Sequence, residues 1–167
     1  TGFSIALNKA SYGVNGLSAL GLDFHLKLKE RNNYNGKTRI FAISDTRRGS
    51  FYFQEFNEEY TKSNNTYDFS LEQLRKKISS EVKSGSLINI CGPFSKNFWQ
   101  NNIITSANCQ VKYDKVNLDA THIASYVAWQ MKNDKPVSPS TPLYLAPAKI
   151  SNSKINVSGR KNKKIDD

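Results

Sequence analysis

The sequence has no hydrophobic run long enough to cross a membrane, and it has little cysteine and histidine. A membrane-spanning helix needs about 20 consecutive apolar residues, and no such stretch occurs among the 167 residues. The two cysteines, Cys91 and Cys109, lie in apolar or strand-like runs and form no Cys-x-x-Cys pair. This placement is typical of buried free thiols in a reducing compartment. No secretory signal is visible, so we expect a cytoplasmic protein that does not associate with membranes.

Sequence signatures of catalysis are also missing. There is no phosphate-binding P-loop, no Gly-x-Ser-x-Gly elbow and no His-Glu-x-x-His zinc motif. The two histidines, His25 and His122, are too far apart in the sequence to make a zinc site without further ligands. A Ser/His/Asp triad depends on spatial placement, and nothing in the sequence points to one. We therefore predict no catalytic residue, no cofactor and no metal site, and a protein that is not an enzyme. An ATP-dependent enzyme or a peptidase is kept as an alternative, which turnover abolished by a change of Asp45 would favour.

Acidic residues are in deficit. The chain has 24 Lys and Arg against 14 Asp and Glu, a formal net charge of +10. Such a charge favours acidic partners such as RNA, an acidic protein face or ATP. The excess is spread over the whole chain, so a generally basic protein without such a partner is the alternative. Residues 150–167 are polar and basic, and we predict a flexible tail there.

The strongest local pattern is a predicted hairpin from Arg39 to Phe56. Its first half contains a continuous apolar run, typical of a strand that is buried on both faces. Its second half alternates aromatic and polar residues, typical of a half-exposed strand. Between them, Asp45 to Gly49 has the composition of a turn. The charged turn is either an anion site or a solvated hairpin tip with local ion pairs.

The first segment, Thr1 to Asn15, is predicted to form a helix that Gly13 and the Asn15-Gly16 pair terminate. Small residues at Gly2, Ala6 and Ala10 would allow close approach of another helix, either within the chain or in a partner. Because the chain starts without Met in what resembles a first helical turn, we expect that something preceded it. One narrow apolar seam runs along this helix: Phe3, Leu7, Ala10 and Val14.

The remaining pattern predicts alternating helices and strands. Residues 17–30 are ambiguous between helix and strand, because apolar residues recur at every second position from Leu20 to Leu28. His25 is expected to be at the surface or half-buried. Ser70 and Gln73 form a capping box that opens a helix, with Leu71, Leu74, Ile78 and Val82 on its buried face. The opposite face or end is basic and is either an RNA contact or a solvated surface. It consists of Arg75, Lys76, Lys77 and Lys83.

Further along, strands are expected at Leu87–Cys91 and Cys109–Tyr113, and a short helix near Phe98 and Trp99. Asp119 is expected to cap a last helix, in which His122 is structural or exposed. The inward stripe of that helix is predicted to be Ile123, Ala124, Val127, Ala128 and Met131. The order of elements predicts an α/β protein with a mixed sheet.

These stretches together resemble the TsaB family, also called YeaZ, the bacterial scaffold subunit for threonylcarbamoyladenosine modification of tRNA. Ile43 to Tyr52 is similar to the family's Asp-Ala-Arg-Arg-Gly-Glu-Val-Tyr hairpin. Thr1 to Leu7 resembles the end of Gly-Pro-Gly-Ser-Phe-Thr-Gly-Leu-Arg-Ile-Gly-Leu, and Gly16 to Leu20 resembles Gly-Val-Ser-Ser-Leu. Asp119-Ala120 with the helix after it, and then Pro142 to Leu145, resemble the family's C-terminal part and its Pro-Leu-Tyr-Leu-Arg ending, with Ala146 in place of the Arg.

The resemblance, over residues 1–149, implies an actin/sugar-kinase-like fold of two lobes with mixed sheets flanked by helices. Residues 1–38 would be the remainder of the N-terminal lobe, whose first strands are missing here, and residues 39–149 the C-terminal lobe. It implies a non-catalytic scaffold that binds a TsaD-type catalytic subunit, with a TsaE-type ATPase, homodimers through the same face, and tRNA as an indirect partner. The alternative is a basic tRNA-binding module. The residues to which we assign partner binding are Phe3, Ala6, Leu7, Ala10 and Val14.

Overall fold

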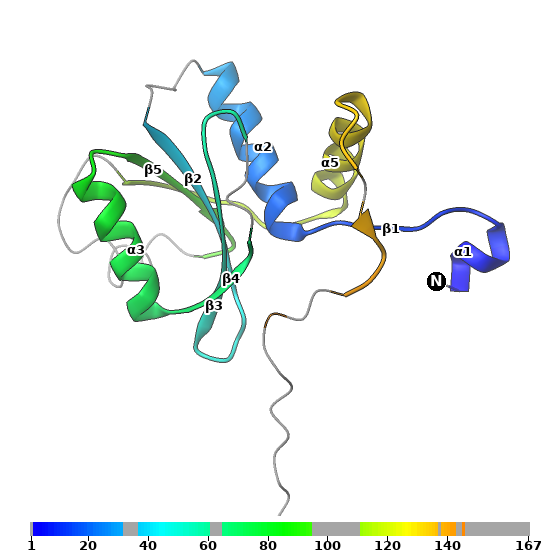
Figure 1. Ribbon diagram of the computed structural model, residues 1–167, viewed down its shortest axis with the longest axis horizontal. Coiled ribbons are helices and arrows are strands. Elements are labelled where there is room, and N and C mark those ends of the chain that lie inside the picture. Colours follow the sequence, from blue (N-terminus) through cyan, green and yellow to red (C-terminus); the bar gives the residue numbers. More distant parts are fainter. Residues whose placement is uncertain are drawn as a thin grey trace, which may run out of the picture.

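Figure 1 shows the computed structural model, which describes residues 2–31, 37–60, 65–94, 111–136, 138–142 and 145. The predicted helix near Phe98, Cys109 and the basic tail lie outside the described residues. The elements are, in chain order, α1 (Gly2–Leu7), β1 (Tyr12–Gly13), α2 (Gly16–Glu30), β2 (Thr38–Asp45), β3 (Ser50–Phe56), β4 (Tyr67–Ser70), α3 (Leu71–Lys83), β5 (Leu87–Gly92), β6 (Val111–Lys115), α5 (Ala120–Lys132) and β7 (Ser138–Pro139).

A five-stranded sheet forms the centre of the molecule, with strand order β4-β3-β2-β5-β6. β3 is antiparallel to both β2 and β4, whereas β5 is parallel to β2 and to β6. α3 connects the antiparallel part to the parallel part across one face of the sheet (Figure 1). This arrangement confirms the predicted α/β fold with a mixed sheet.

The predicted hairpin is confirmed as β2 and β3. The side chains of Ile40 to Ile43 are fully buried, because β2 is a central strand with a helix covering each face. At the turn, the Asp45 carboxylate accepts a hydrogen bond from the backbone N–H of Arg47 at 2.7 Å. Gly49 has a φ of 82°, a left-handed conformation that glycine adopts without steric cost. Some of the polar groups of the charged turn are therefore satisfied by hydrogen bonds within the turn itself.

Successive residues of the strands point to opposite faces, and two hydrophobic clusters result. α2 covers one face, and α5 packs against α2 (Figure 1). α3 covers the other face. The cluster under α2 contains, among others, Leu20, Leu22, Phe24, Ile40, Ala42, Phe56 and Cys91. The cluster under α3 contains Phe41, Ile43, Phe51, Phe53, Leu74, Ile78, Ile88, Ile90 and Phe94.

The predicted helix from Thr1 to Asn15 is wrong beyond Leu7. Asn8 adopts a φ of 47°, and the N–H of Lys9 donates to the carbonyl of Ser4 at 3.0 Å while the N–H of Asn8 donates to that of Ile5 at 3.3 Å. These two bonds are the Schellman motif, which ends a helix at a left-handed residue, and asparagine tolerates that conformation. The chain then forms β1, which pairs with β7 in a two-stranded antiparallel sheet.

The ambiguous segment after Asn15 is a helix. Asn15 opens α2 as its N-cap, and its side chain accepts from the N–H groups of Leu17 and Ser18. The expectation that Asn15 and Gly16 terminate the first helix is therefore wrong. His25, expected to be at the surface or half-buried, is only 3% exposed. It is buried because α2 lies between the sheet and α5 and packs on both.

The two later helices differ in how well their buried faces were predicted. α3 has the expected capping box of Ser70 and Gln73, and Leu74 and Ile78 are buried as predicted. α5 begins at its predicted cap, Asp119, but Tyr126 and Gln130 are its buried residues. The prediction is wrong for three residues of the stripe, which are exposed: Ala124, Ala128 and Met131. Tyr126 and the neighbouring Trp129 bury more apolar area against α2 and Tyr60 than alanine would.

Candidate functional site

The helix α1 extends away from the body of the molecule (Figure 1). None of its residues is buried. Phe3 is 86% exposed, Ile5 79% and Leu7 65%. Single exposed apolar residues are common on proteins, but three within six residues form a cluster that isolated surface residues do not explain. The segment also carries no charge, so it offers an apolar, uncharged surface to a partner.

The five residues predicted to bind a partner do not form one seam. Phe3 and Leu7 are four positions apart on α1 and therefore share one face of that helix. Ala6 is also on α1 and exposed, whereas Ala10 is exposed beyond the end of the helix. Val14 follows β1 and packs partly buried against the cluster under α2. Their assigned role in partner binding stays a prediction, and the geometry concentrates it on Phe3 and Leu7.

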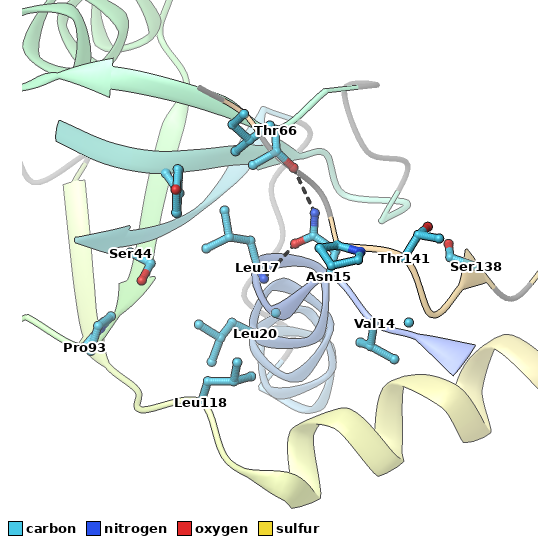
Figure 2. Close-up of a pocket in the computed structure, with 15 residues that line it drawn as sticks. Val14, Asn15, Leu17, Leu20, Ser44, Thr66, Pro93, Leu118, Ser138 and Thr141 are labelled. Atoms are coloured by element: carbon cyan, nitrogen blue, oxygen red, sulfur yellow. Dashed lines mark hydrogen bonds between the residues drawn. The ribbon is translucent and has the colours of Figure 1, made fainter. Parts of the chain in front are cut away.

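A pocket opens directly after β1, at the N-terminal end of α2 (Figure 2). Its volume is about 610 Å³. Ser44 lies near the carboxyl end of β2 and Pro93 just after the carboxyl end of β5, so the pocket sits at the edge of the sheet where parallel strands end. Ligands of open α/β sheets bind at that edge. The remaining lining residues are Gly13, Val14, Asn15, Gly16, Leu17, Leu20, Tyr52, Thr66, Leu118, Ser138, Thr141, Pro142 and Leu145.

Asn15 fixes the shape of this pocket. Its carboxamide oxygen accepts from the N–H of Leu17 at 2.9 Å, and its Nδ2 donates to the Thr66 hydroxyl at 2.9 Å (Figure 2). One side chain thereby caps α2 and connects it to the segment before β4. Because the cap already occupies these N–H groups, the helix end is not free to take an anion.

Tyr52 connects the pocket to the hairpin tip. Its ring lines the pocket, and its hydroxyl accepts a hydrogen bond from Arg48 at 3.1 Å. Ser44 and Tyr52 are paired across β2 and β3, and Tyr52 is paired with Asp68 of β4. These three residues therefore lie in a row across the sheet. One carboxylate oxygen of Asp68 is buried and has no hydrogen bond within the described residues.

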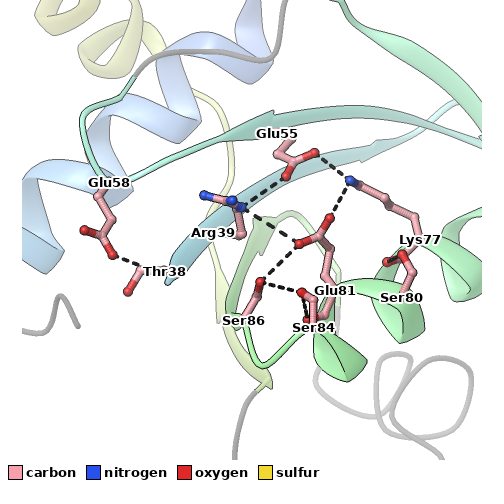
Figure 3. Close-up of polar contacts among 9 residues, drawn as sticks. All are labelled: Thr38, Arg39, Glu55, Glu58, Lys77, Ser80, Glu81, Ser84 and Ser86. Carbon is pink, nitrogen blue, oxygen red and sulfur yellow. Dashed lines mark hydrogen bonds and ion pairs between the residues drawn. The ribbon is translucent and has the colours of Figure 1, made fainter. Parts of the chain in front are cut away.

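A separate cluster of charged side chains fastens α3 to the sheet (Figure 3). Lys77 of α3 contacts Glu55 and Glu81, each at 2.8 Å. Burial works to lower the pKa of Lys77, and the hydrogen bonds to the two carboxylates raise it overall. On the same helix Lys76 pairs with Glu72 at 2.7 Å. Two of the lysines on the predicted basic face are thus already paired with carboxylates, which favours the solvated-surface interpretation over an RNA contact.

The buried titratable groups have structural environments. Burial raises the pKa of the Cys91 thiol, so the thiol stays protonated and unreactive. Burial also raises the pKa of Tyr60, whose hydroxyl donates to the carbonyl of Ser18. Burial, followed by the charge of Lys29, lowers the pKa of His25 to about 4. His122 completes the capping box of α5 with Asp119 and lies 3.6 Å from the Asp23 carboxylate of α2, a structural role as expected.

Sequence reasoning did not find the pocket. Ser44, Thr66, Leu118 and Thr141 line it together although they are distant in the sequence, and no local motif connects them. The cap at Asn15 was the one available signal, because Asn before an apolar helical segment is a typical N-cap. Among the described residues, no group of three or more His, Cys, Asp or Glu side chains is placed to hold a metal ion. In the same residues, no helix is both long and apolar enough to cross a membrane.

Comparison with known proteins identifies structures with a similar fold. The sequence matches no protein-family model and no curated protein. Two solved structures from Pseudomonas aeruginosa are similar in three dimensions. One is an uncharacterized protein with similarity to peptidase YEAZ, with a TM-score of 0.56, 15% identity, and coverage of 87% of this chain and 63% of that one. The other is YeaZ, with a TM-score of 0.54, 14% identity, and coverage of 86% and 64%.

The chain is therefore an α/β protein with a five-stranded mixed sheet flanked by helices. Its fold is the YeaZ fold, and the predicted resemblance is confirmed at that level. The chain spans slightly less than two thirds of the length of these two neighbours.

Proposed function

We propose that the chain is a non-catalytic scaffold subunit of the tRNA threonylcarbamoyladenosine modification system, which binds and activates a TsaD-type catalytic subunit. In this proposal the fold belongs to the two-lobed actin/sugar-kinase class, with a TsaE-type ATPase and tRNA as further members of the assembly. A homodimer through the same surface is part of the proposal. The YeaZ fold supports the placement in this system.

The observation that carries the proposal is the exposure of α1. Phe3 and Leu7 share one face of an uncharged helix and are 86% and 65% exposed. Burying two such side chains against a partner would stabilise a complex by about 1.5–3 kcal/mol each. The hairpin, whose sequence resembles that of the same family, folds as predicted.

The direct test is complex formation with a TsaD-type subunit, measured by size-exclusion chromatography with light scattering. We expect a one-to-one complex with the unmodified protein and its loss with Leu7→Glu, because the substitution places a charge in an apolar interface. Met131→Glu is the matched control, because Met131 is 59% exposed and lies on α5 rather than α1. A complex that survives Leu7→Glu would move the interface elsewhere, and no complex with the unmodified protein would contradict the proposal.

The second candidate is a basic tRNA-binding module, favoured by the net charge of +10. It predicts tRNA affinity that falls steeply with salt, because binding releases counterions from the phosphate backbone. Deletion of residues 151–167 should then reduce the salt dependence. Affinity that is weak and insensitive to this deletion would exclude the module and leave the scaffold as the surviving candidate.

A further inference from the structure

The pocket at the N-terminal end of α2 shares only Val14 with the residues assigned to partner binding, and its lining has a distinct chemistry. None of the described residues that line it carries a charge (Figure 2). Its volume of about 610 Å³ lies in the range of small-molecule sites, which extends from about 300 to 1,000 Å³. A charged ligand would lose its hydration there without gaining a counter-charge from the lining. The lining therefore selects for an uncharged ligand.

The polar groups of the pocket indicate which functional groups that ligand carries. The Thr66 hydroxyl oxygen accepts from Asn15 Nδ2 at 2.9 Å, and within the described residues its own hydrogen has no acceptor. Thr66 can therefore donate into the pocket, and a carbonyl or hydroxyl oxygen is the matching acceptor. No hydrogen bond within the described part of the chain engages the Ser44 hydroxyl, which can either donate or accept.

The apolar groups indicate the body of the ligand. Leu17, Leu20 and Leu118 line the pocket (Figure 2). Tyr52 is also a lining residue. An aromatic ring of a ligand can stack on or pack edge-on against Tyr52 and gain more than its buried area alone would give, and the leucines contribute apolar contact area. Asn15 is held by hydrogen bonds at both ends of its carboxamide, so this wall of the pocket is already in place before a ligand arrives. A preformed wall reduces the entropy lost on binding.

We propose that this pocket binds an uncharged, ring-containing small molecule through a carbonyl or hydroxyl oxygen that accepts a hydrogen bond from Thr66. The proposal is independent of the partner surface on α1, and either can hold without the other. The site recognises its ligand by excluding charge, by packing a ring against leucines and tyrosine, and by one directed hydrogen bond.

Benzamide, benzoate and toluene are the probes for this proposal, and NMR titration of the full chain is the measurement. Benzamide and benzoate have nearly the same shape and differ in charge, whereas toluene keeps the ring and lacks the acceptor. We expect benzamide to shift the signals of Asn15 and Leu118 saturably and to bind at least tenfold more tightly than benzoate. Equal or tighter binding of benzoate would overturn the proposal.

Two substitutions separate the hydrogen bond from the shape of the pocket. Thr66→Val has nearly the same side-chain volume and removes both the donor to the ligand and the acceptor of Asn15 Nδ2. It should weaken benzamide several-fold, and unchanged toluene binding would show that the pocket keeps its shape. Ser44→Leu should fill the pocket and abolish binding of both probes, whereas Ser80→Leu on the exposed face of α3 should not. If Ser44→Leu fails to fold, Thr66→Val alone decides the question.

The remaining outcomes also decide it. Equal loss of benzamide and toluene binding in Thr66→Val would show a structural role for Thr66 and overturn the proposed hydrogen bond. Absence of saturable binding by every probe, in a protein whose spectrum is dispersed and folded, would overturn the small-molecule site. In that case, contacts between Phe3 or Leu7 and Leu118 in isotope-filtered nuclear Overhauser spectra of mixed labelled and unlabelled protein would identify α1 of a second copy as the occupant.

Discussion

The helices α1 and α2 are close in the sequence and both rich in apolar residues, yet their environments are opposite. No residue of the six in α1 is buried. Nine of the 15 residues in α2 are buried. The local sequence of both segments favours a helix, but it does not determine which other elements each helix contacts.

The difference comes from neighbours. α2 lies between the sheet and α5, so it buries side chains on two sides. At Gly21, which has no side chain, the helix backbone approaches the Phe56 ring. α1 is separated from the body by the Schellman turn at Asn8 and by β1, and none of the described elements covers it. The same kind of side chain thus stabilises the fold in α2 and remains available for binding in α1. The following predictions test this contrast.

The largest expected effect is a loss of core packing in α2. Leu22 is 1% exposed, so Leu22→Ala should lower the free energy of unfolding by about 2–5 kcal/mol. Leu7→Ala in α1 should change it by less than about 0.5 kcal/mol, because that side chain is exposed. Urea unfolding followed by circular dichroism measures both. A comparable loss from Leu7→Ala would mean that α1 is packed in solution and would remove the contrast.

The next effect concerns the close approach of α2 to the sheet. A Cβ at Gly21 would lie 2.4 Å from the Phe56 ring, and Phe56 is fully buried and stacked on Tyr60 at 4.8 Å. Gly21→Ala should therefore cost about 1–3 kcal/mol of stability through overpacking. At Gly16 an added Cβ would lie 2.6 Å from the end of the Leu118 side chain. Leu118 is 46% exposed, so its side chain can move away. Gly16→Ala should cost less in thermal denaturation, and the reverse order would contradict this packing.

A third effect is a pH dependence that arises in the buried face of α2. Burial, with a smaller contribution from Lys29, lowers the pKa of His25 to about 4 in the folded protein, against 6.5 ordinarily. Between these values the unfolded chain binds a proton that the folded chain does not. The contribution of His25 to the free energy of unfolding is therefore complete above about pH 6.5. It is lost as the pH falls toward 4, by at most about 1.4 kcal/mol per pH unit.

The test compares the wild type with His25→Gln, which cannot titrate in this range. Urea unfolding at pH 7, 6 and 5 should show a steeper loss of stability in the wild type. His122, on the first turn of α5, provides the matched control, and His122→Gln should retain the steep dependence. Parallel curves for the wild type and His25→Gln would show that His25 is not buried in solution.

The smallest expected effect is at the start of α2. Asn15→Ala removes the N-cap and the hydrogen bond to Thr66, and it should cost about 1 kcal/mol. Asn15→Asp keeps the capping oxygen and loses the donor to Thr66. Relative to Asn15→Ala, it should therefore restore most of the capping energy but only part of the lost stability. Thermal denaturation of the two variants separates the contributions. Equal loss in both would show that the Thr66 bond, rather than the cap, holds this end of α2.

Features that depend on neighbouring residues in the sequence were predicted well. The β2–β3 hairpin followed from alternation and from the turn composition at Asp45 and Gly49. The start of α3 followed from the spacing of Ser70 and Gln73, and its buried face followed from helical periodicity. In each case the stabilising contact lies within a few residues or along one amphipathic face. Short-range sequence patterns are therefore enough to predict these features without knowledge of the tertiary structure.

Features that depend on packing between distant segments were not predicted. The inward face of α5 was assigned to a stripe that included Ala124 and Met131, and the helix instead packs through Tyr126 and Trp129, because its neighbour is α2 rather than the sheet. The end of α1 at Leu7 depends on the left-handed conformation of Asn8, which asparagine permits but does not require. The candidate pocket needs residues from seven separate stretches of the chain.

By itself, the sequence determined the α/β class, the hairpin, and the capped starts of α3 and α5, because short-range hydrogen bonds and hydrophobic periodicity specify them. Only the tertiary structure decided that α2 is buried on two sides, that α1 leaves Phe3 and Leu7 in solvent, and that an uncharged pocket opens beside Asn15. The physical reason is that burial is a property of pairs of surfaces. The sequence of an apolar segment shows which surface is available for burial, and the arrangement of the other elements determines whether that surface is buried.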